Sequence, residues 1–125
     1  MPASQTPHPL APLAERRFSA DHVWIDPGGF IGVTPHLFGR PGPVVRVELP
    51  ELGTELVVAE PFAVIELEKA TLDVFAPCTA VVVALDEALD DLAERPLERW
   101  LVRVECELPE LLTWSSYRAR FGAPR

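Results

Sequence analysis

The chain contains 125 residues, of which 48% are hydrophobic, and this length suits one domain with a single core. Its formal net charge of −8 argues against a nucleic-acid-binding protein, because phosphates are neutralised by lysine and arginine. No apolar run approaches the roughly 20 residues that cross a bilayer, which argues against a membrane-spanning protein.

The N-terminal segment MPASQTPHPLAPLA is rich in proline and has no charged side chain. It lacks the basic start and the continuous apolar stretch of a secretory signal. We therefore expect residues 1–16 to form a disordered tail and residues 17–125 to form a single domain, in a cytoplasmic protein.

Short runs that are apolar or alternate between apolar and polar residues dominate from residue 23 to residue 84. HVWID and FIGVT flank Pro27-Gly28-Gly29, which predicts a hairpin turn. Residues 35–43 contain three prolines and two glycines and leave room for one turn of helix at most. Further strands are expected in VVRVELP (44–50), LVV (56–58), FAVIELE (62–68), TLDVF (71–75) and TAVVVAL (79–85).

The pattern of FAVIELE predicts that Phe62, Val64 and either Ile65 or Leu67 point inward, while the glutamates face water. The chain is then expected to reverse at residues 68–70, at the tip of a hairpin.

Two helices are expected in the C-terminal third of the chain. Residues 86–94 begin with acidic side chains, and residues 109–122 open with proline and end with basic residues and glycine. Residues 99–106 are expected to form another strand. The fold class is therefore mainly β, a small sandwich or barrel with a C-terminal helix.

Lys69 is the only lysine in the chain, and the other ten basic residues are arginine. An amine can form a stable amide with a carboxylic acid, whereas a guanidinium stays protonated at physiological pH. A modifying enzyme can also reach a hairpin tip without unfolding the protein. A lysine that carries a long prosthetic arm fits this position, although a solvated turn lysine fits it too.

The cysteines and histidines show no metal-binding pattern. Cys78 and Cys106 are far apart without CxxC spacing, and we interpret them as two small buried hydrophobic residues in a reducing compartment. His8, His22 and His36 have neither helical nor zinc-finger spacing. For His22 we favour a structural role, and we interpret the three tryptophans as core or helix-docking anchors.

Several segments together resemble the glycine cleavage system H proteins, which are relatives of lipoyl domains. FSADHVW (18–24) resembles the entry motif of that family, IGVT (31–34) its second strand, and VVRVELPELG (44–53) a further strand and turn. VIELEKATLDVFAP (64–77) resembles the segment around the lipoylated lysine. Trp100-Leu101 and the terminal helix with Tyr117 also fit, so the resemblance extends over roughly residues 18–121.

The resemblance implies a flattened, lipoyl-domain-like β-barrel or sandwich that catalyses nothing alone. Lys69 would be the attachment site of lipoate, held as lipoyl-lysine. Glu66 would help the lipoylating ligase or transferase to recognise the hairpin, although a solvated strand carboxylate remains an equal alternative. No catalytic residue is assigned.

The resemblance also implies a set of partners. The carrier would shuttle an aminomethyl intermediate and reducing equivalents between a pyridoxal-phosphate-dependent glycine decarboxylase, an aminomethyltransferase and a dihydrolipoyl dehydrogenase. It would act as a monomer and would bind neither nucleic acid nor membranes. Tethering would raise the local concentration of the arm at each partner to the millimolar scale.

Some positions depart from the family pattern. Leu67 and Glu68 replace the usual Ser-Val before the lysine, and Asp86 replaces an asparagine. Ala80 replaces a glycine, which would cost about 1 kcal/mol or more if that site required a positive φ. DDLAERPLERW (90–100) is shorter than the corresponding connection, and residues 35–43 replace a short Ala-rich helix.

These departures leave alternatives open. The chain could be a divergent H-like lipoyl carrier that serves lipoate relay, sulfur oxidation or a redox response, or an unmodified interaction module. A biotin carrier is disfavoured because its lysine usually lies between methionines. An acid–base enzyme is disfavoured because the strand carboxylates alternate with apolar residues, as on a solvated sheet face.

Overall fold

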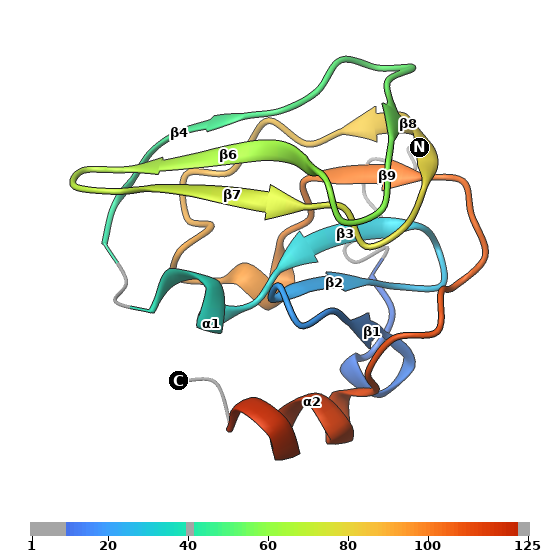
Figure 1. Cartoon of the computed structure of the whole chain (residues 1–125). Helices are drawn as coiled ribbons and strands as arrows, with labels where there is room; N and C mark the ends of the chain where they lie inside the picture. The colour runs from blue at the N-terminus through green and yellow to red at the C-terminus, as the bar shows by residue number, and fades with distance from the viewer. Residues whose placement is uncertain (1–9, 40–41, 123–125) are drawn as a thin grey trace, which may run out of the picture.

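The computed structural model describes residues 10–39 and 42–122. Two antiparallel β-sheets pack face to face, and a C-terminal helix lies against the larger sheet (Figure 1). This arrangement confirms the expected mainly β class. The sheets form a flattened sandwich and do not close into a barrel.

The larger sheet has six strands in the order β1–β2–β3–β9–β8–β5, and the smaller has the order β4–β6–β7. The strands are β1 (Arg17–Phe18), β2 (Val23–Ile25), β3 (Phe30–Val33), β4 (Val44–Glu48), β5 (Glu55–Leu56), β6 (Pro61–Leu67), β7 (Thr71–Phe75), β8 (Ala80–Leu85) and β9 (Val102–Val104). The helices are α1 (Pro35–Phe38) and α2 (Trp114–Phe121), with 3₁₀ turns η2 (Leu13–Glu15) and η3 (Pro96–Glu98).

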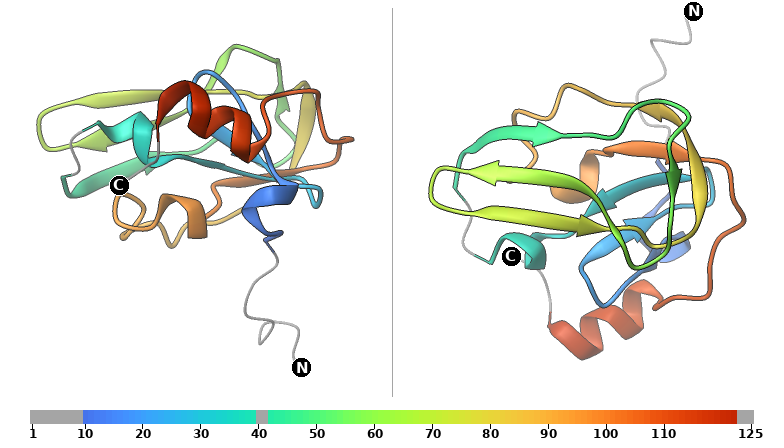
Figure 2. Two further views of the ribbon diagram at one scale, coloured as in Figure 1. Left: turned by 90° about the horizontal axis from the view of Figure 1, so that it is seen from below. Right: turned by 45° about the horizontal axis from the view of Figure 1, so that its top comes forward.

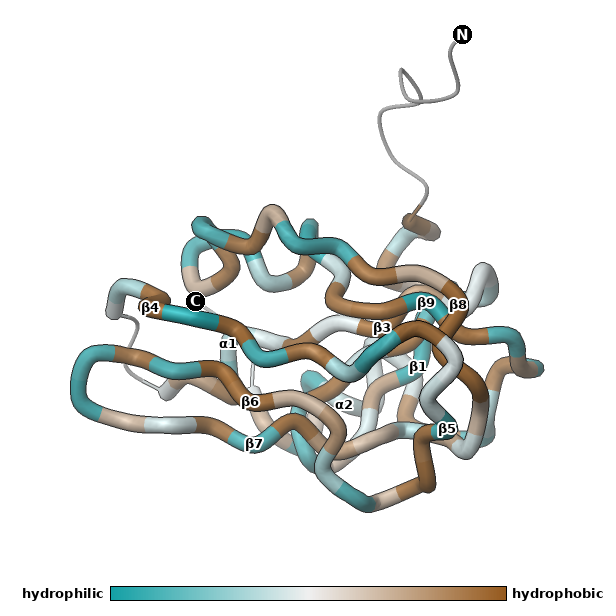
Figure 3. Tube along the Cα trace, turned by 90° about the horizontal axis from the view of Figure 1, so that it is seen from above, coloured by the Kyte–Doolittle hydropathy of each residue, from teal (hydrophilic) through white to brown (hydrophobic). Residues whose placement is uncertain are grey.

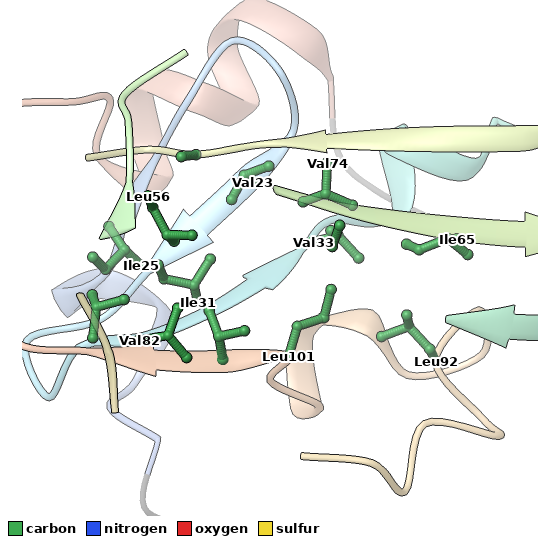
Figure 4. Packing of buried hydrophobic residues seen from close by; sticks show 14 of the residues in the cluster. Val23, Ile25, Ile31, Val33, Leu56, Ile65, Val74, Val82, Leu92 and Leu101 are labelled. Atoms are coloured by element: carbon green, nitrogen blue, oxygen red, sulfur yellow. The ribbon is translucent and has the colours of Figure 1, made fainter. Parts of the chain in front are cut away.

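The main core lies between the two sheets, where branched aliphatic side chains from both meet (Figure 4). Ile65 of β6 and Val74 of β7 are fully buried there. The buried residues of β6 are Ala63 and Ile65, so the expectation for Ile65 is confirmed and that for Val64 was wrong. Phe62 is half-buried and packs against the core, as expected. The register of β6 with β7 shifts between Pro61 and Ala63, so Phe62 and Ala63 both contact the core although a regular strand buries alternate residues only.

A second cluster covers the opposite face of the six-stranded sheet. Phe18, Trp24 and Tyr117 are fully buried in it, and Trp100 and Trp114 pack against them. This arrangement confirms the three tryptophans as anchors. The helix α2 is thus attached to the sheet by aromatic packing.

The expected N-terminal tail is ordered in its described part. Residues 1–9 lie outside the described residues, but Arg16 is only 6% exposed. Its guanidinium donates to the carbonyl oxygens of Leu97 at 2.7 Å and Ala11 at 2.8 Å, and it stacks 4.3 Å above the Trp24 ring. The carbonyl contacts satisfy the buried charge, so residues 10–16 belong to the packed domain.

The expected turn between β2 and β3 is present and is organised by a buried carboxylate. Asp26 accepts hydrogen bonds from the amides of Gly28 at 2.9 Å and Phe30 at 3.0 Å. Gly29 has a φ of 88°, and a Cβ added there would lie 1.9 Å from the carbonyl oxygen of Val104. Both conditions restrict this position to glycine.

The expected helix at residues 86–94 is absent, because isolated turns replace it. The carboxylate of Asp86 accepts a hydrogen bond from the Ala88 amide, and the backbone amide of Asp86 donates one to the Leu101 carbonyl oxygen. These bonds favour a turn at the point where a helix would have to begin. Leu89 and Leu92 are nevertheless buried in the core.

The C-terminal helix and the preceding strand are both shorter than expected. Residues 99–106 form a strand only over β9. The backbone of Leu112 exchanges hydrogen bonds with Phe18, so the helix cannot start at residue 109. It starts after Thr113, whose side chain accepts a hydrogen bond from the Ser116 amide, an N-cap. The single helical turn expected within residues 35–43 is α1.

Candidate functional site

Lys69 lies at the tip of the hairpin that joins β6 and β7. The two strands are connected by Glu68, Lys69 and Ala70, and the Leu67 amide donates to the Ala70 carbonyl oxygen at 2.8 Å. Residues 68–70 are all exposed. The expected chain reversal at these residues is therefore confirmed.

The hairpin is anchored at its base and projects at its tip. Ile65 and Val74 are buried in the core, and β6 also pairs with β4. The tip extends to the edge of the molecule (Figures 1 and 2) and is hydrophilic (Figure 3). The side chain at the tip therefore stands on a rigid support but has free approach from solvent.

The environment of the Lys69 amine fits an amide-linked prosthetic group. Among residues 10–39 and 42–122, no hydrogen bond or ion pair engages its ammonium group, although Glu68 precedes it directly in the sequence. An exposed primary amine without a partner can be acylated without breaking an existing contact. The residues present thus fit lipoate, whose carboxyl group would need such an amine.

Glu66, the candidate recognition residue, is held by an arginine from the neighbouring strand. Arg46 donates to the Glu66 carboxylate from Nη2 at 2.6 Å and from Nε at 3.1 Å, and it also contacts Glu48. The hydrogen bond to Glu66, and secondarily its charge, raise the pKa of Arg46. The Glu66 side chain remains 30% exposed.

Arg46 is a residue that the sequence analysis missed. Its position opposite Glu66 depends on the register between β4 and β6, which is irregular between Val44 and Arg46. The alternating pattern of β4 was recognised, but the pattern alone gives no register with a partner strand. The only available signal for a basic partner was the pair of glutamates, Glu66 and Glu68, on the expected solvent-facing side of the hairpin.

His22 has the structural role that was favoured for it. Its Nδ1 lies 2.7 Å from the hydroxyl oxygen of Tyr117, and that oxygen lies 2.7 Å from the hydroxyl of Thr34. Burial lowers the pKa of His22, the nearby His36 lowers it further, and Asp21 opposes both effects. The chain of contacts joins α2 to the sheet and does not reach the hairpin tip.

Ala80 does not carry the cost that a positive φ would impose. It lies in β8, and the described residues with positive φ other than glycine are His22 and Ala59. The replacement of glycine is therefore compatible with an ordinary extended backbone.

A surface cavity of about 510 Å³ lies beside β4, between that strand and residues 85–90. Arg46 is among its lining residues, whereas Lys69 is not. This cavity is therefore separate from the hairpin tip.

The described part of the chain gives no structural sign of metal binding or of membrane insertion. No group of three histidine, cysteine, aspartate or glutamate side chains is arranged there to hold a metal ion. None of the helices within residues 10–39 and 42–122 has the length and apolar character needed to traverse a bilayer.

The two cysteines are closer together than the sequence suggested. Cys78 is buried, as expected, whereas Cys106 is only half-buried. Their sulfur atoms lie 3.2 Å apart, although the residues are separated by 28 positions. Spacing along the chain gave no sign of this contact because the pairing of β8 with β9 produces it.

Comparison with known proteins places these features in a family. Residues 16–118 match the family model described as Glycine cleavage H-protein. The chain is 33% identical to the glycine cleavage system H protein of Deinococcus radiodurans, an alignment that covers 85% of the chain and 93% of that relative. It is 35% identical to the protein of the same name from Geobacillus thermodenitrificans, over 84% of the chain and 92% of that relative.

A solved structure agrees with the sequence comparisons. The crystal structure of a glycine cleavage system H protein from Mycobacterium marinum superimposes with a TM-score of 0.77 at 31% identity. The match covers 90% of this chain and 100% of the other. Fold and sequence therefore indicate the same relationship.

Proposed function

The chain belongs to the glycine cleavage H-protein family, and from this membership we propose that it is the lipoyl-bearing carrier of the glycine cleavage system, with lipoate attached to Lys69. In this role it carries an aminomethyl group and reducing equivalents between the enzymes of that system. It has no catalytic residue of its own.

The observation that carries the proposal is the position of the only lysine. Lys69 occupies an exposed, three-residue connection between two strands that are anchored in the core. None of the ten arginines could replace it, because a guanidinium is not acylated under physiological conditions.

The protein supplies placement, and the prosthetic group supplies chemistry. When attached, lipoate contributes a dithiolane that accepts the transferred group and undergoes two-electron redox change. The hairpin holds the attachment nitrogen away from the sheets, so an arm anchored there can reach the site of a docked enzyme. Because the arm is tethered, weak and exchangeable docking contacts are sufficient.

Glu66 supports recognition by the lipoylating enzyme in this proposal. It lies on β6, three residues before Lys69, with its carboxylate partly exposed. The lipoylating ligase or transferase reads this carboxylate together with the shape of the hairpin. Arg46 fixes the position of the carboxylate before the enzyme arrives.

The proposed partners are a glycine decarboxylase, an aminomethyltransferase and a dihydrolipoyl dehydrogenase, met by a monomeric carrier in the cytoplasm. The net charge of −8 favours association with partners that present basic surfaces. The irregular turns of residues 86–94, which differ from the expected helix, belong to the surface on which such partners are distinguished.

The first test is the intact mass of the protein from cells supplied with lipoate. We expect a lipoyl-sized addition that maps to Lys69 and is absent from Lys69→Arg, which keeps the positive charge but cannot be acylated. Unmodified protein under these conditions would contradict the proposal and favour an interaction module.

The second test separates the pathways. The lipoylated protein, mixed with a glycine decarboxylase and glycine, is expected to support exchange of the glycine carboxyl group with labelled bicarbonate. A lipoylated protein that is inactive in this exchange would instead be a carrier for another pathway. An established H protein in the same assay serves as the positive control.

A further inference from the structure

The contact between the two cysteines joins distant parts of the chain at the end of the sandwich away from the hairpin tip. Cys78 lies in the connection between β7 and β8, and Cys106 follows β9 by two residues. The pairing of β8 with β9, which sets Val82 opposite Val104, brings the two connections together. The sulfur atoms lie 3.2 Å apart.

The surroundings of the pair differ between its two members. Cys78 is 9% exposed and belongs to the main core, whereas Cys106 is half-buried and packs against that core. Burial, together with the contact to Cys106, raises the pKa of the Cys78 thiol to about 12. An oxidant that arrives from solvent therefore meets Cys106 first, while Cys78 stays protonated behind it.

We propose that Cys78 and Cys106 form a covalent modification site, at which hydroperoxides convert the two thiols into an intramolecular disulfide. A disulfide has an S–S distance of about 2.05 Å, so closure requires the sulfur atoms to approach by roughly 1.2 Å. Such a movement is within reach of side-chain rotation at Cys106, which is only half-buried.

The reaction is balanced with hydrogen peroxide as the oxidant. The Cys106 thiolate attacks one peroxide oxygen, the O–O bond breaks, and the released hydroxide takes up a proton to become water. Cys106 is then a sulfenic acid. The Cys78 sulfur attacks the Cys106 sulfur, the S–O bond breaks, and the leaving hydroxide departs as water with the Cys78 proton. The two thiols lose two electrons in total, and the peroxide gains them.

The cross-link would join two segments that contribute to both clusters of the protein. Cys78 follows the base of the β6–β7 hairpin, and Cys106 opens the segment that leads to Leu112 and α2. Lys69 lies at the other end of β7, so the site is independent of the proposed lipoyl attachment. Closing the intervening loop restricts the unfolded chain and is expected to raise Tm by on the order of 10 °C.

Peptide mapping tests the proposal directly. The reduced full-length protein is treated with hydrogen peroxide, and remaining thiols are alkylated before digestion. Trypsin cuts after Arg99 and Arg103 and so separates the two cysteines. We expect one linked peptide pair lacking two hydrogen atoms, neither cysteine alkylated, and full reversal by dithiothreitol.

The control is the same experiment on Lys69→Arg, which cannot carry a lipoyl dithiol. The linked pair is expected to persist in this variant, whatever the outcome of the lipoylation test. Independent oxidation of either cysteine to sulfinic acid, two alkylated cysteines, or a disulfide between two chains would each overturn the proposal.

Thermal melting gives a second readout. The oxidised protein is expected to melt above the reduced protein, and the difference should vanish in Cys106→Ser, where a half-buried sulfur is replaced by a hydroxyl of similar shape. An equal difference in that variant would contradict the assignment. The buried Cys78 is left unchanged, because its replacement disturbs the core.

Discussion

Lys69 and Glu66 lie three residues apart on one hairpin, but their surroundings differ. The Lys69 ammonium meets no partner among the described residues, whereas the Glu66 carboxylate takes two hydrogen bonds from Arg46. One side chain is available for covalent change, and the other is held in a fixed orientation. Both residues could be identified from the sequence, because Lys69 is the only lysine and Glu66 precedes it by three residues. It could not identify Arg46, because the register of β4 against β6 is a tertiary feature.

The Arg46–Glu66 pair predicts how variants alter the rate of lipoylation. Glu66→Gln is expected to slow lipoylation of Lys69 by about tenfold, since a charge-assisted contact to the lipoylating enzyme is lost. Arg46→Ala is expected to slow it by no more than about threefold, because the carboxylate loses the contacts that fix its position and an exposed ion pair is weak. Initial rates with purified ligase measure both effects. Faster modification of Arg46→Ala would show that Arg46 competes with the enzyme for the carboxylate and does not orient it.

The surroundings of Gly29 predict that the addition of one methyl group, in Gly29→Ala, causes a large loss of stability. In Gly29→Ala the Cβ would lie 1.9 Å from the Val104 carbonyl oxygen at a φ of 88°. We expect the free energy of unfolding to fall by at least about 2 kcal/mol in urea titrations. Gly53→Ala is the matched control, because its φ is 86° but its surroundings are open. It should cost only about 1 kcal/mol, and equal losses in the two variants would rule out the steric explanation.

At the scale of elements, the strands were easier to predict than the helices. Short runs that are apolar or alternate between apolar and polar residues marked β4, β6, β7 and β8, and β6 and β8 each bury alternate residues. The helix expected at residues 86–94 is absent, because the acidic residues that favour a helix N-terminus include Asp86, whose carboxylate instead accepts from the Ala88 amide in a turn. The start of α2 was misplaced because the Leu112 backbone is used in a pairing with Phe18, which no local pattern reveals.

The docking of α2 predicts a dependence of stability on pH. Burial, and then His36, lower the pKa of His22, whose Nδ1 contacts the Tyr117 hydroxyl. The unfolded state therefore binds more protons below about pH 6.5, and the free energy of unfolding falls as the pH decreases through that value. It levels off below the lowered pKa of the folded state.

Urea titrations between about pH 5 and pH 8 measure this effect. His22→Asn is the control, since asparagine tolerates the φ of 69° and does not titrate. A slope that is unchanged in this variant would assign the effect to another group. Asp21, which raises the pKa of His22, reduces the size of the expected change.

At the scale of the whole molecule, the six-stranded sheet contributes side chains to two hydrophobic clusters, one on each of its faces. The six-stranded sheet packs against β4–β6–β7 on one face and against α2 and the N-terminal segment on the other. The mainly β class was predictable from the short valine-rich runs. The second cluster was only partly predictable, because aromatic residues near both ends of the chain contribute to it and their contacts are not local.

The net charge of −8 predicts how partners associate with the carrier. Electrostatic attraction to basic surfaces is screened by salt, so affinity for a glycine decarboxylase should fall as ionic strength rises from about 0.05 M to about 0.5 M. Titration calorimetry or surface plasmon resonance measures this change. An uncharged osmolyte at matched osmolality serves as the control, and an affinity that does not respond to salt would exclude electrostatic steering.

The pairing of Phe18 with Leu112 has a consequence for biosynthesis. Phe18 can pair with β2 early, but its bridge to Leu112 forms only after residues 19–112 have been synthesised, and Tyr117 must follow before Phe18 and Trp24 are covered. A nascent chain interrupted before this point would expose an aromatic surface to chaperones and proteases. Synthesis of α2 is thereby coupled to the concealment of that surface.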